Sequence, residues 1–257
     1  MKINKDNHVF TIVFTFISTI VLVFPLTLAY VGTKPIADNY WRLQHIVKTL
    51  HSLGLSADAK NPDQARAEYE TLTKYTVGTM GTDNAGHPAV TFGRLDYNAI
   101  AQDPSKLQLL KVDDSVIDKA LQDNSYTGNI PVFFYVTTVD GQQRFGGDFT
   151  GPGLWGNVSL AVGVNADGSQ IIGTQVLFNV ETPGLGGRIG EPWFTGQFSG
   201  LKPAATGLVF NQSGQKVDNG FDAIAGATIT STAVKDIINN HALVLLKALI
   251  AQLGGKS

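Results

Sequence analysis

Residues 9–31 form a run without a charged side chain, and this run limits the possible folds more than any other feature. Ile, Val, Leu and Phe dominate it. A helix needs about 20 such residues to cross a hydrocarbon core of about 30 Å. The run therefore predicts a membrane-spanning helix, with an anchor over residues 1–33. Pro25 and the Thr and Ser residues are compatible with a span, because their hydroxyls can bond to the helix backbone.

A cleaved signal peptide is the alternative for this segment. The run is longer than an apolar signal core of about 7–15 residues, and no small-x-small site ends it, so an uncleaved anchor is favoured. Lys2 and Lys5 precede the run, whereas Lys34, Arg42 and Lys48 follow it. This charge count leans slightly towards a cytoplasmic body.

The composition is that of a folded domain. Of 257 residues, 43% are hydrophobic and 16% charged, and the formal charge is −2. The part after the anchor is long enough for one domain with a buried core. A weakly acidic chain is a poor candidate for binding nucleic acid. The absence of cysteine excludes disulfides, Cys-ligated zinc, iron–sulfur clusters and thiol nucleophiles.

Hydrophobic periodicity predicts helices first and strands later. Helices are expected over residues 34–55, 64–73 and 113–121, strands over 131–138, 158–164 and 170–180, a hairpin turn at 165–168, and a second hairpin from 208–211 and 214–217. A long C-terminal helix should end at Gly254 and Gly255. This order predicts an α+β fold with a mainly antiparallel sheet. The expected parts are the anchor, a helical juxtamembrane region at 34–75 and a domain at 76–257.

Familiar catalytic patterns are missing. The chain has no Walker A loop, no HExxH and no GxSxG. The histidines lack the spacing of a metal site, and they are His8, His45, His51, His87 and His241. Solvated or packed roles are expected for His45 and His51. His241 lies on the apolar face of the last helix and should be a satisfied core histidine.

Residues 181–187 read Glu-Thr-Pro-Gly-Leu-Gly-Gly and directly follow an expected strand. Pro183 fixes one turn position, and the glycines allow positive φ. Such a loop exposes backbone N–H groups and can lie against a flat ring. Taken alone, a plain Pro-Gly turn is the favoured interpretation.

Residues 222–232 bring small side chains and hydroxyls to the start of the C-terminal helix. The first N–H groups of a helix lack partners and carry partial positive charge, so a phosphate suits this place. The alternative is a hydroxyl-rich N-cap with Thr230 or Ser231 capping the first turn. Local physics alone favours the cap.

Together these two stretches resemble the FMN-binding domain family. The C-type subunit (NqrC) of the Na⁺-translocating NADH:quinone reductase and the G-type subunit of the Rnf complex share this domain. Asp-x-x-x-Gly-Ala-Thr-x-Thr-Ser, from Asp222 to Ser231, resembles the flavinylation motif. Residues 181–186 resemble the second family signature. Residues 151–156 (Gly-Pro-Gly-Leu-Trp-Gly), the single anchor and the length are more typical of the NqrC type. The resemblance is specific from residue 146 onwards.

The resemblance implies FMN bonded through a phosphoester to Thr228, with no catalytic residue and no metal. Leu154, Trp155, Thr182 and Leu185 would contact the ring, and Gly226 and Ala227 would hold the phosphate. The complete expected set of cofactor-binding residues is Leu154, Trp155, Glu181, Thr182, Gly184, Leu185, Gly186, Asp222, Gly226, Ala227, Thr228, Thr230 and Ser231. Two positions depart from the family pattern. Ala225 stands where Ser or Thr is usual, and Asn179-Val180 replaces a pair containing His.

The resemblance also implies a role, a location and partners. The chain would relay single electrons through FMN within a Na⁺-translocating NADH:quinone oxidoreductase, as its NqrC-type subunit. It would cross the bacterial inner membrane once, with the FMN domain on the periplasmic side despite the charge count. Partners would be other subunits, a flavin transferase and lipid around residues 9–31. The alternatives are a stand-alone anchored FMN protein or the G-type subunit of an Rnf complex, and a binding module without flavin.

Overall fold

The computed structural model describes residues 8–82, 88–122, 131–212 and 215–254. The chain divides into two compact units, Met1–Arg42 and Leu43–Ser257. Helix α1 (His8–Ser52) is continuous, so it forms the described part of the first unit and contributes its last turns to the second. The sequence predicted helical structure on both sides of residue 34, and the structure joins the two stretches without a break.

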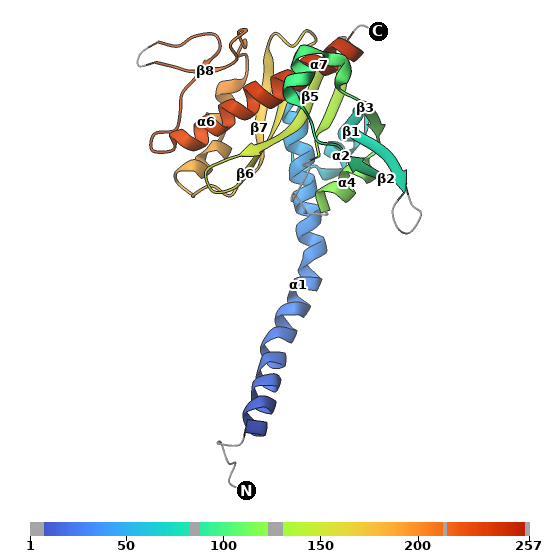
Figure 1. Cartoon of the computed structure of the whole chain (residues 1–257), viewed down its shortest axis with the longest axis vertical. Helices are drawn as coiled ribbons and strands as arrows, with labels where there is room; N and C mark the ends of the chain where they lie inside the picture. The colour runs from blue at the N-terminus through green and yellow to red at the C-terminus, as the bar shows by residue number, and fades with distance from the viewer. Residues whose placement is uncertain (1–7, 83–87, 123–130, 213–214, 255–257) are drawn as a thin grey trace. The chain divides into compact units, whose positions relative to one another are not determined.

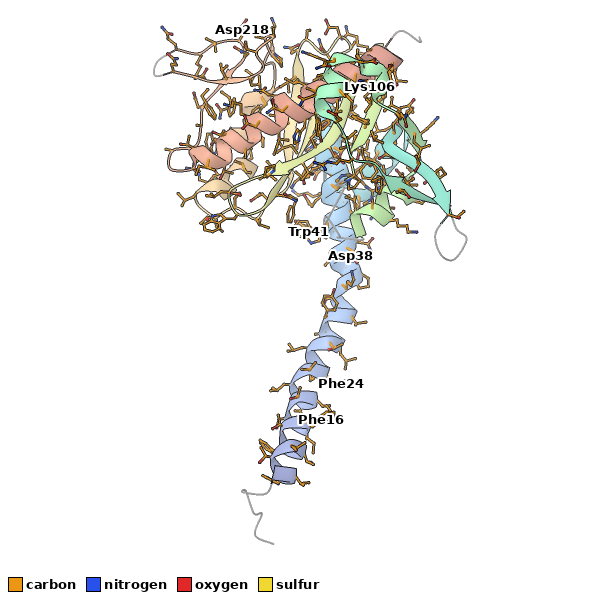
Figure 2. The ribbon with its side chains drawn as sticks, viewed as in Figure 1. Phe16, Phe24, Asp38, Trp41, Lys106 and Asp218 are labelled. Carbon is orange, nitrogen blue, oxygen red and sulfur yellow. The ribbon has the colours of Figure 1, made fainter. Side chains whose placement is uncertain are left out.

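The first unit is a helix whose apolar side chains are exposed. Phe16 and Phe24 project from it in Figure 2 and are 69% and 61% exposed. Thr15, Thr19 and Thr27 each donate a hydrogen bond to the carbonyl four residues earlier, as expected of hydroxyls in a spanning helix. By length and composition, α1 can cross a membrane.

The second unit is built on a seven-stranded antiparallel sheet, which confirms the α+β prediction. Its strands run in the order β2-β1-β4-β5-β6-β7, and β3 pairs with β1. The strands are β1 (Thr73–Thr82), β2 (Pro88–Phe92), β3 (Leu109–Val112), β4 (Phe133–Val139), β5 (Gln142–Pro152), β6 (Asn157–Val164) and β7 (Ile171–Phe178). The expected boundary between residues 75 and 76 falls inside β1.

The sequence predicted β4, β6 and β7 but none of β1, β2, β3 and β5. Strand β5 contains the run Gly146, Gly147 and Asp148, which has low strand propensity. It is nevertheless central, because it pairs with β4 on one side and β6 on the other. Tertiary pairing therefore decides this strand against its local preference.

The turn predicted at residues 165–168 is confirmed. It joins β6 to β7, Gly168 adopts φ +71°, and its N–H donates to the Asn165 carbonyl at 3.0 Å. The second predicted hairpin is wrong in its pairing. Strand β8 (Val209–Phe210) runs parallel to β9 (Gly220–Phe221). Between these two strands along the chain, Gln212 and Gln215 form an isolated antiparallel bridge. Residues 213–214 lie outside the described residues.

Strand β4 shows that the sheet is covered on both faces. Successive side chains of a strand point to opposite sides. Phe133 and Tyr135 pack with the end of α1, whereas Phe134 packs with the C-terminal helix. The uninterrupted apolar character of this strand follows from that double burial.

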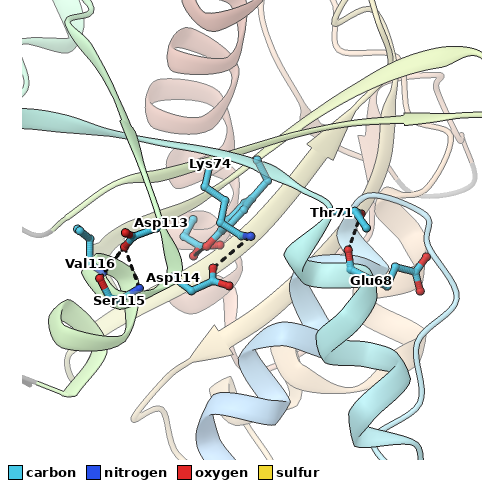
Figure 3. Close-up of polar contacts among 9 residues, drawn as sticks. Glu68, Thr71, Lys74, Asp113, Asp114, Ser115 and Val116 are labelled. Carbon is cyan, nitrogen blue, oxygen red and sulfur yellow. Dashed lines mark hydrogen bonds and ion pairs between the residues drawn. The ribbon is translucent and has the colours of Figure 1, made fainter.

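Short helices complete the side of the sheet that contains the end of α1. Helix α2 (Pro62–Glu70) begins two residues before the predicted start at residue 64, and it ends before residue 73 because Thr73 enters β1. Thr71 donates its hydroxyl to the Glu68 carbonyl at 2.7 Å (Figure 3). Helix α4 (Asp114–Gln122) matches the predicted helix, and Asp113 accepts from the N–H groups of Ser115 and Val116 at its start. Helix α3 (Tyr97–Gln102) and η1 (Pro104–Lys106) were not predicted, and they pack with the C-terminal helix on the other side of the sheet.

A buried polar cluster lies among these elements. Asp148 on β5 binds His45 Nε2 at 2.8 Å and the Tyr135 hydroxyl at 2.7 Å through the same oxygen, Oδ2. Buried Lys74 pairs with Asp114 at 3.1 Å (Figure 3) and lies over the ring of Tyr69. His45 is therefore packed, one of the two roles expected for it. Residues from α1, β4 and β5 are joined by one carboxylate.

Two glycines allow the end of α1 to lie directly on the sheet. A methyl group at Gly163 of β6 would overlap the backbone carbonyl of Ser52. One at Gly173 of β7 would lie 2.9 Å from the His51 carbonyl oxygen. The contact is between backbones, so no rotamer change can relieve it.

We expect Gly163→Ala to lower the free energy of unfolding by about 2–3 kcal/mol, as overpacking in a closed core does. Urea unfolding of the detergent-solubilised chain measures this change. Gly190→Ala is the control, because nothing lies within 4 Å of a methyl group there. Equal stability of the two variants would contradict the close approach.

The C-terminal helix covers the other face of the sheet. It consists of α6 (Thr228–Asp236), the π-helical turn η4 (Ile237–Ala242) and α7 (Leu243–Leu253), and it lies against β5 and β6 (Figure 1). Gly254 follows its last residue, as predicted. His241 stacks on Tyr97 and bonds to the Thr150 carbonyl at 3.0 Å, so it is satisfied, although only half-buried. Burial lowers the pKa of His241, and the bond to Thr150 opposes that shift.

Candidate functional site

Three loops at one end of the sheet supply the residues expected to bind a cofactor. Residues 153–156 follow β5, residues 179–187 follow β7, and residues 222–227 lead into α6. The buried side chain of Glu181, only 5% exposed, joins them. Its Oε1 accepts from the N–H groups of Leu154 at 2.8 Å and Trp155 at 3.0 Å, and its Oε2 accepts from the Thr230 hydroxyl at 2.6 Å.

The loop after β7 is a tight turn, as its sequence predicted. The N–H groups of Leu185 and Gly187 both donate to the Thr182 carbonyl, at 3.1 and 2.9 Å, and Gly184 adopts φ +77°. The turn also brings its Leu185 side chain to 3.5 Å from where a methyl group on Gly226 would lie. The structure therefore places the glycine loop beside the segment that precedes α6.

The predicted hydroxyl cap at the start of α6 is wrong. The N-cap is Ala227, and among the described residues no side chain caps the first turn. Thr230 bonds to Glu181 instead. The Ser231 hydroxyl accepts from the Ile224 N–H and donates to the Ala227 carbonyl, both at 3.0 Å. Because α6 begins at Thr228, both hydroxyls lie inside the helix and not at its N-cap, and the first turn keeps the N–H groups and partial positive charge that suit a phosphate.

Thr228 is exposed at this start of α6, and so are Ala225 and Gly226 before it. Gly226 adopts φ +78°, a conformation that favours glycine. The hydroxyl of Thr228 is accessible for attachment.

Large apolar side chains on two of these segments and on the first turn of α6 are also exposed. Trp155 is 69% exposed, Leu154 48%, Leu185 47% and Ile229 61%. Exposed apolar groups gathered in this way usually mark a binding surface. A flat aromatic ring is a suitable partner, because its faces are apolar and its edges carry the polar atoms.

One residue of the expected cofactor-binding set, Asp222, and one residue outside it, Asn179, form local hydrogen bonds. Asp222 accepts from Asn211 Nδ2 at 2.8 Å, and its N–H donates to Gln197 Oε1 at 2.8 Å, so it fixes the loop before α6. None of its described contacts reaches Thr228. Asn179, at a position that departs from the family pattern, accepts from the Glu181 N–H at 3.2 Å.

These residues fit FMN by their chemistry. The uncapped start of α6 suits the phosphate, the accessible Thr228 hydroxyl suits a phosphoester, and the exposed apolar groups suit the ring. The role of Glu181 as the connection between the three segments is not visible in the sequence. Its partners are 26 to 49 residues away along the chain, and no local pattern identifies them.

Comparison with known proteins agrees with this chemistry. The family model of the FMN-binding domain matches residues 153–242. The chain is 41% identical over 113 residues to the G-type subunit of the ion-translocating oxidoreductase complex of Methanosarcina acetivorans, covering 43% of this chain and 57% of that protein. It is 27% identical over 195 residues to the C-type subunit of the Na(+)-translocating NADH-quinone reductase of Vibrio campbellii, covering 73% and 72%.

Two crystal structures share the fold. The C-type subunit of the Na(+)-translocating NADH-quinone reductase from Parabacteroides distasonis superposes with a TM-score of 0.53 at 23% identity, over 85% of this chain and 95% of that one. NqrC of Shewanella oneidensis gives 0.55 at 19% identity, over 86% and 100%. Both therefore support the arrangement of the sheet and helices described above.

Proposed function

We propose, from the match of residues 153–242 to the FMN-binding domain family, that the chain is an electron-carrying flavoprotein subunit of a membrane redox complex. FMN is held covalently by a phosphoester to Thr228. The observation that carries the proposal is the first turn of α6, where an exposed threonine hydroxyl and an uncapped helix start coincide.

The protein positions the flavin, and the flavin supplies the one-electron chemistry. Leu154, Trp155 and Leu185 offer apolar contact to the ring, and Gly226 leaves room for the phosphate next to Thr228. A bond through the phosphate leaves the electronics of the ring to its neighbours. Thr228 is a tether in this scheme and moves no proton.

The relatives guide the choice of complex. One is named as part of an ion-translocating oxidoreductase complex and another as part of a Na(+)-translocating NADH-quinone reductase. Our proposal is the NqrC-type role, since the chain covers 72% of the Vibrio relative but 57% of the Methanosarcina one. Helix α1 anchors the chain in lipid with the flavin domain outside the cytoplasm, and a flavin transferase attaches the FMN.

Denaturing gel electrophoresis under ultraviolet light tests the tether. The full chain, co-expressed with a flavin transferase from the same genome, should give a fluorescent band at its own mass. No band would reject covalent attachment. A band that appears only after Ala225→Ser would instead support the binding module without flavin, because Ala225 is exposed and its substitution leaves the core intact.

The second candidate function is a stand-alone role or the G-type role. The 41% identity to a G-type relative supports the G-type role. Purification in mild detergent separates the stand-alone role from a role in a complex, and the identity of the co-purifying subunits separates the G-type role from the NqrC-type role. Co-purification of several membrane subunits supports a complex. A single-subunit preparation that passes electrons to soluble acceptors would contradict the NqrC-type assignment.

A further inference from the structure

The carboxylate of Glu181 is buried yet forms no ion pair among the described residues. Its three hydrogen bonds come from two backbone N–H groups and one hydroxyl, and in all three the carboxylate accepts. The groups that meet this carboxylate are therefore neutral dipoles alone, at the point where the three segments of the candidate site join.

Two glycines show that the loops are built around this carboxylate. A methyl group at Gly153 would lie 2.5 Å from Glu181 Oε1. One at Gly186 would lie 2.8 Å from Oε2 and 2.6 Å from the Thr230 hydroxyl oxygen. Both loops therefore approach the carboxylate more closely than any other residue type permits.

The partners of the carboxylate are neighbours of the residues that face the cofactor. The two N–H donors belong to Leu154 and Trp155, whose own side chains are exposed. Thr230 is two residues after Thr228 on the first turns of α6. A change at Glu181 would therefore displace the ring-contacting backbone and the attachment helix together.

We propose that Glu181 is a positioning residue for the flavin and not one of its ligands. Its carboxylate sets the Leu154–Trp155 backbone and the first turn of α6 before the cofactor arrives, and its uncompensated charge makes the bound flavin harder to reduce. This inference rests on the proposed FMN site. A nearby negative charge disfavours the addition of an electron, especially where few counter-charges screen it.

Hydrogen exchange tests the positioning role without any flavin. In the full chain carrying Thr228→Val, peptides covering residues 153–157 should exchange about tenfold faster in Glu181→Ala, whereas peptides of β6 keep their protection. Glu181→Gln retains an oxygen for both N–H groups and should restore slow exchange. Glu181→Asp keeps the charge but withdraws the carboxylate by one methylene. In this variant the same peptides should exchange faster than with Glu181, by a smaller factor than in Glu181→Ala. Unchanged exchange in Glu181→Ala and Glu181→Asp would overturn the proposal.

The flavin midpoint potential tests the charge. In chains carrying Thr228, Glu181→Gln should shift the potential in the positive direction, because it removes the charge and keeps the shape. Thr230→Val removes one hydrogen bond but keeps the charge, so its shift should be smaller. An unchanged potential in Glu181→Gln would overturn the proposal. Failure of the FMN proposal itself is recognised separately, because no flavin would then be bound and the exchange result would still stand.

Discussion

Replacing Thr228 with valine should abolish covalent FMN and leave the fold intact. Valine has nearly the same shape but lacks the hydroxyl that the phosphoester requires. The side chain is exposed and caps nothing, so we expect a change in stability of no more than about 0.5 kcal/mol. The fluorescent band of the denatured protein measures attachment, and circular dichroism measures the fold.

Thr232→Val is the matched control for this experiment. Thr232 lies one turn further along the same helix and carries the same hydroxyl. Its variant should keep the full fluorescence. Equal fluorescence of Thr228→Val and the parent chain would place the flavin on another residue, and loss of the band in both variants would show a defect of the helix.

The second large effect should come from Asp148. Asp148→Ala removes the acceptor shared by His45 Nε2 and the Tyr135 hydroxyl inside the core. Removing one partner of a buried polar network costs about 3 kcal/mol or more, because the remaining groups lose hydrogen bonds that water cannot replace. Urea unfolding in detergent should show this as a lower midpoint.

Asp218→Ala provides the control, because Asp218 is an exposed aspartate (labelled in Figure 2). It should change the free energy of unfolding by less than about 0.5 kcal/mol. The His45→Ala and Asp148→Ala double variant should lose less than the sum of the single variants, since both remove the same contact. Additive losses, or a silent Asp148→Ala, would contradict a coupled network.

In the candidate site, the sequence predicted some features from neighbouring residues, and contacts between distant residues decided the others. The motif of residues 222–231 predicted a helix start that suits a phosphate, and the structure keeps that start uncapped. The hydroxyls near this helix start predicted Thr230 or Ser231 as the cap, and this was wrong, because the N-cap is Ala227. The helix begins at Thr228, before both residues, and Thr230 donates to a carboxylate 49 residues away, which no neighbouring residue indicates.

The sequence by itself determined the features that depend on neighbouring residues. These are the uncharged helix at residues 9–31, the turn before β7, the apolar face of the C-terminal helix and the order of the three motif segments. Periodicity and turn chemistry act over a few residues, so they can be read along the chain.

Only the tertiary structure decided which distant residues meet. Strand β5 exists because β4 and β6 hold it, although Gly146 and Gly147 disfavour a strand. The end of α1 packs on the sheet because Gly163 and Gly173 have no side chains there. Glu181 joins the three segments because β5 and β7 both pair antiparallel with β6 and so end at the same edge of the sheet, where α6 begins. Such contacts arise from sheet pairing and close packing, whose partners are set by the whole fold and by no short segment.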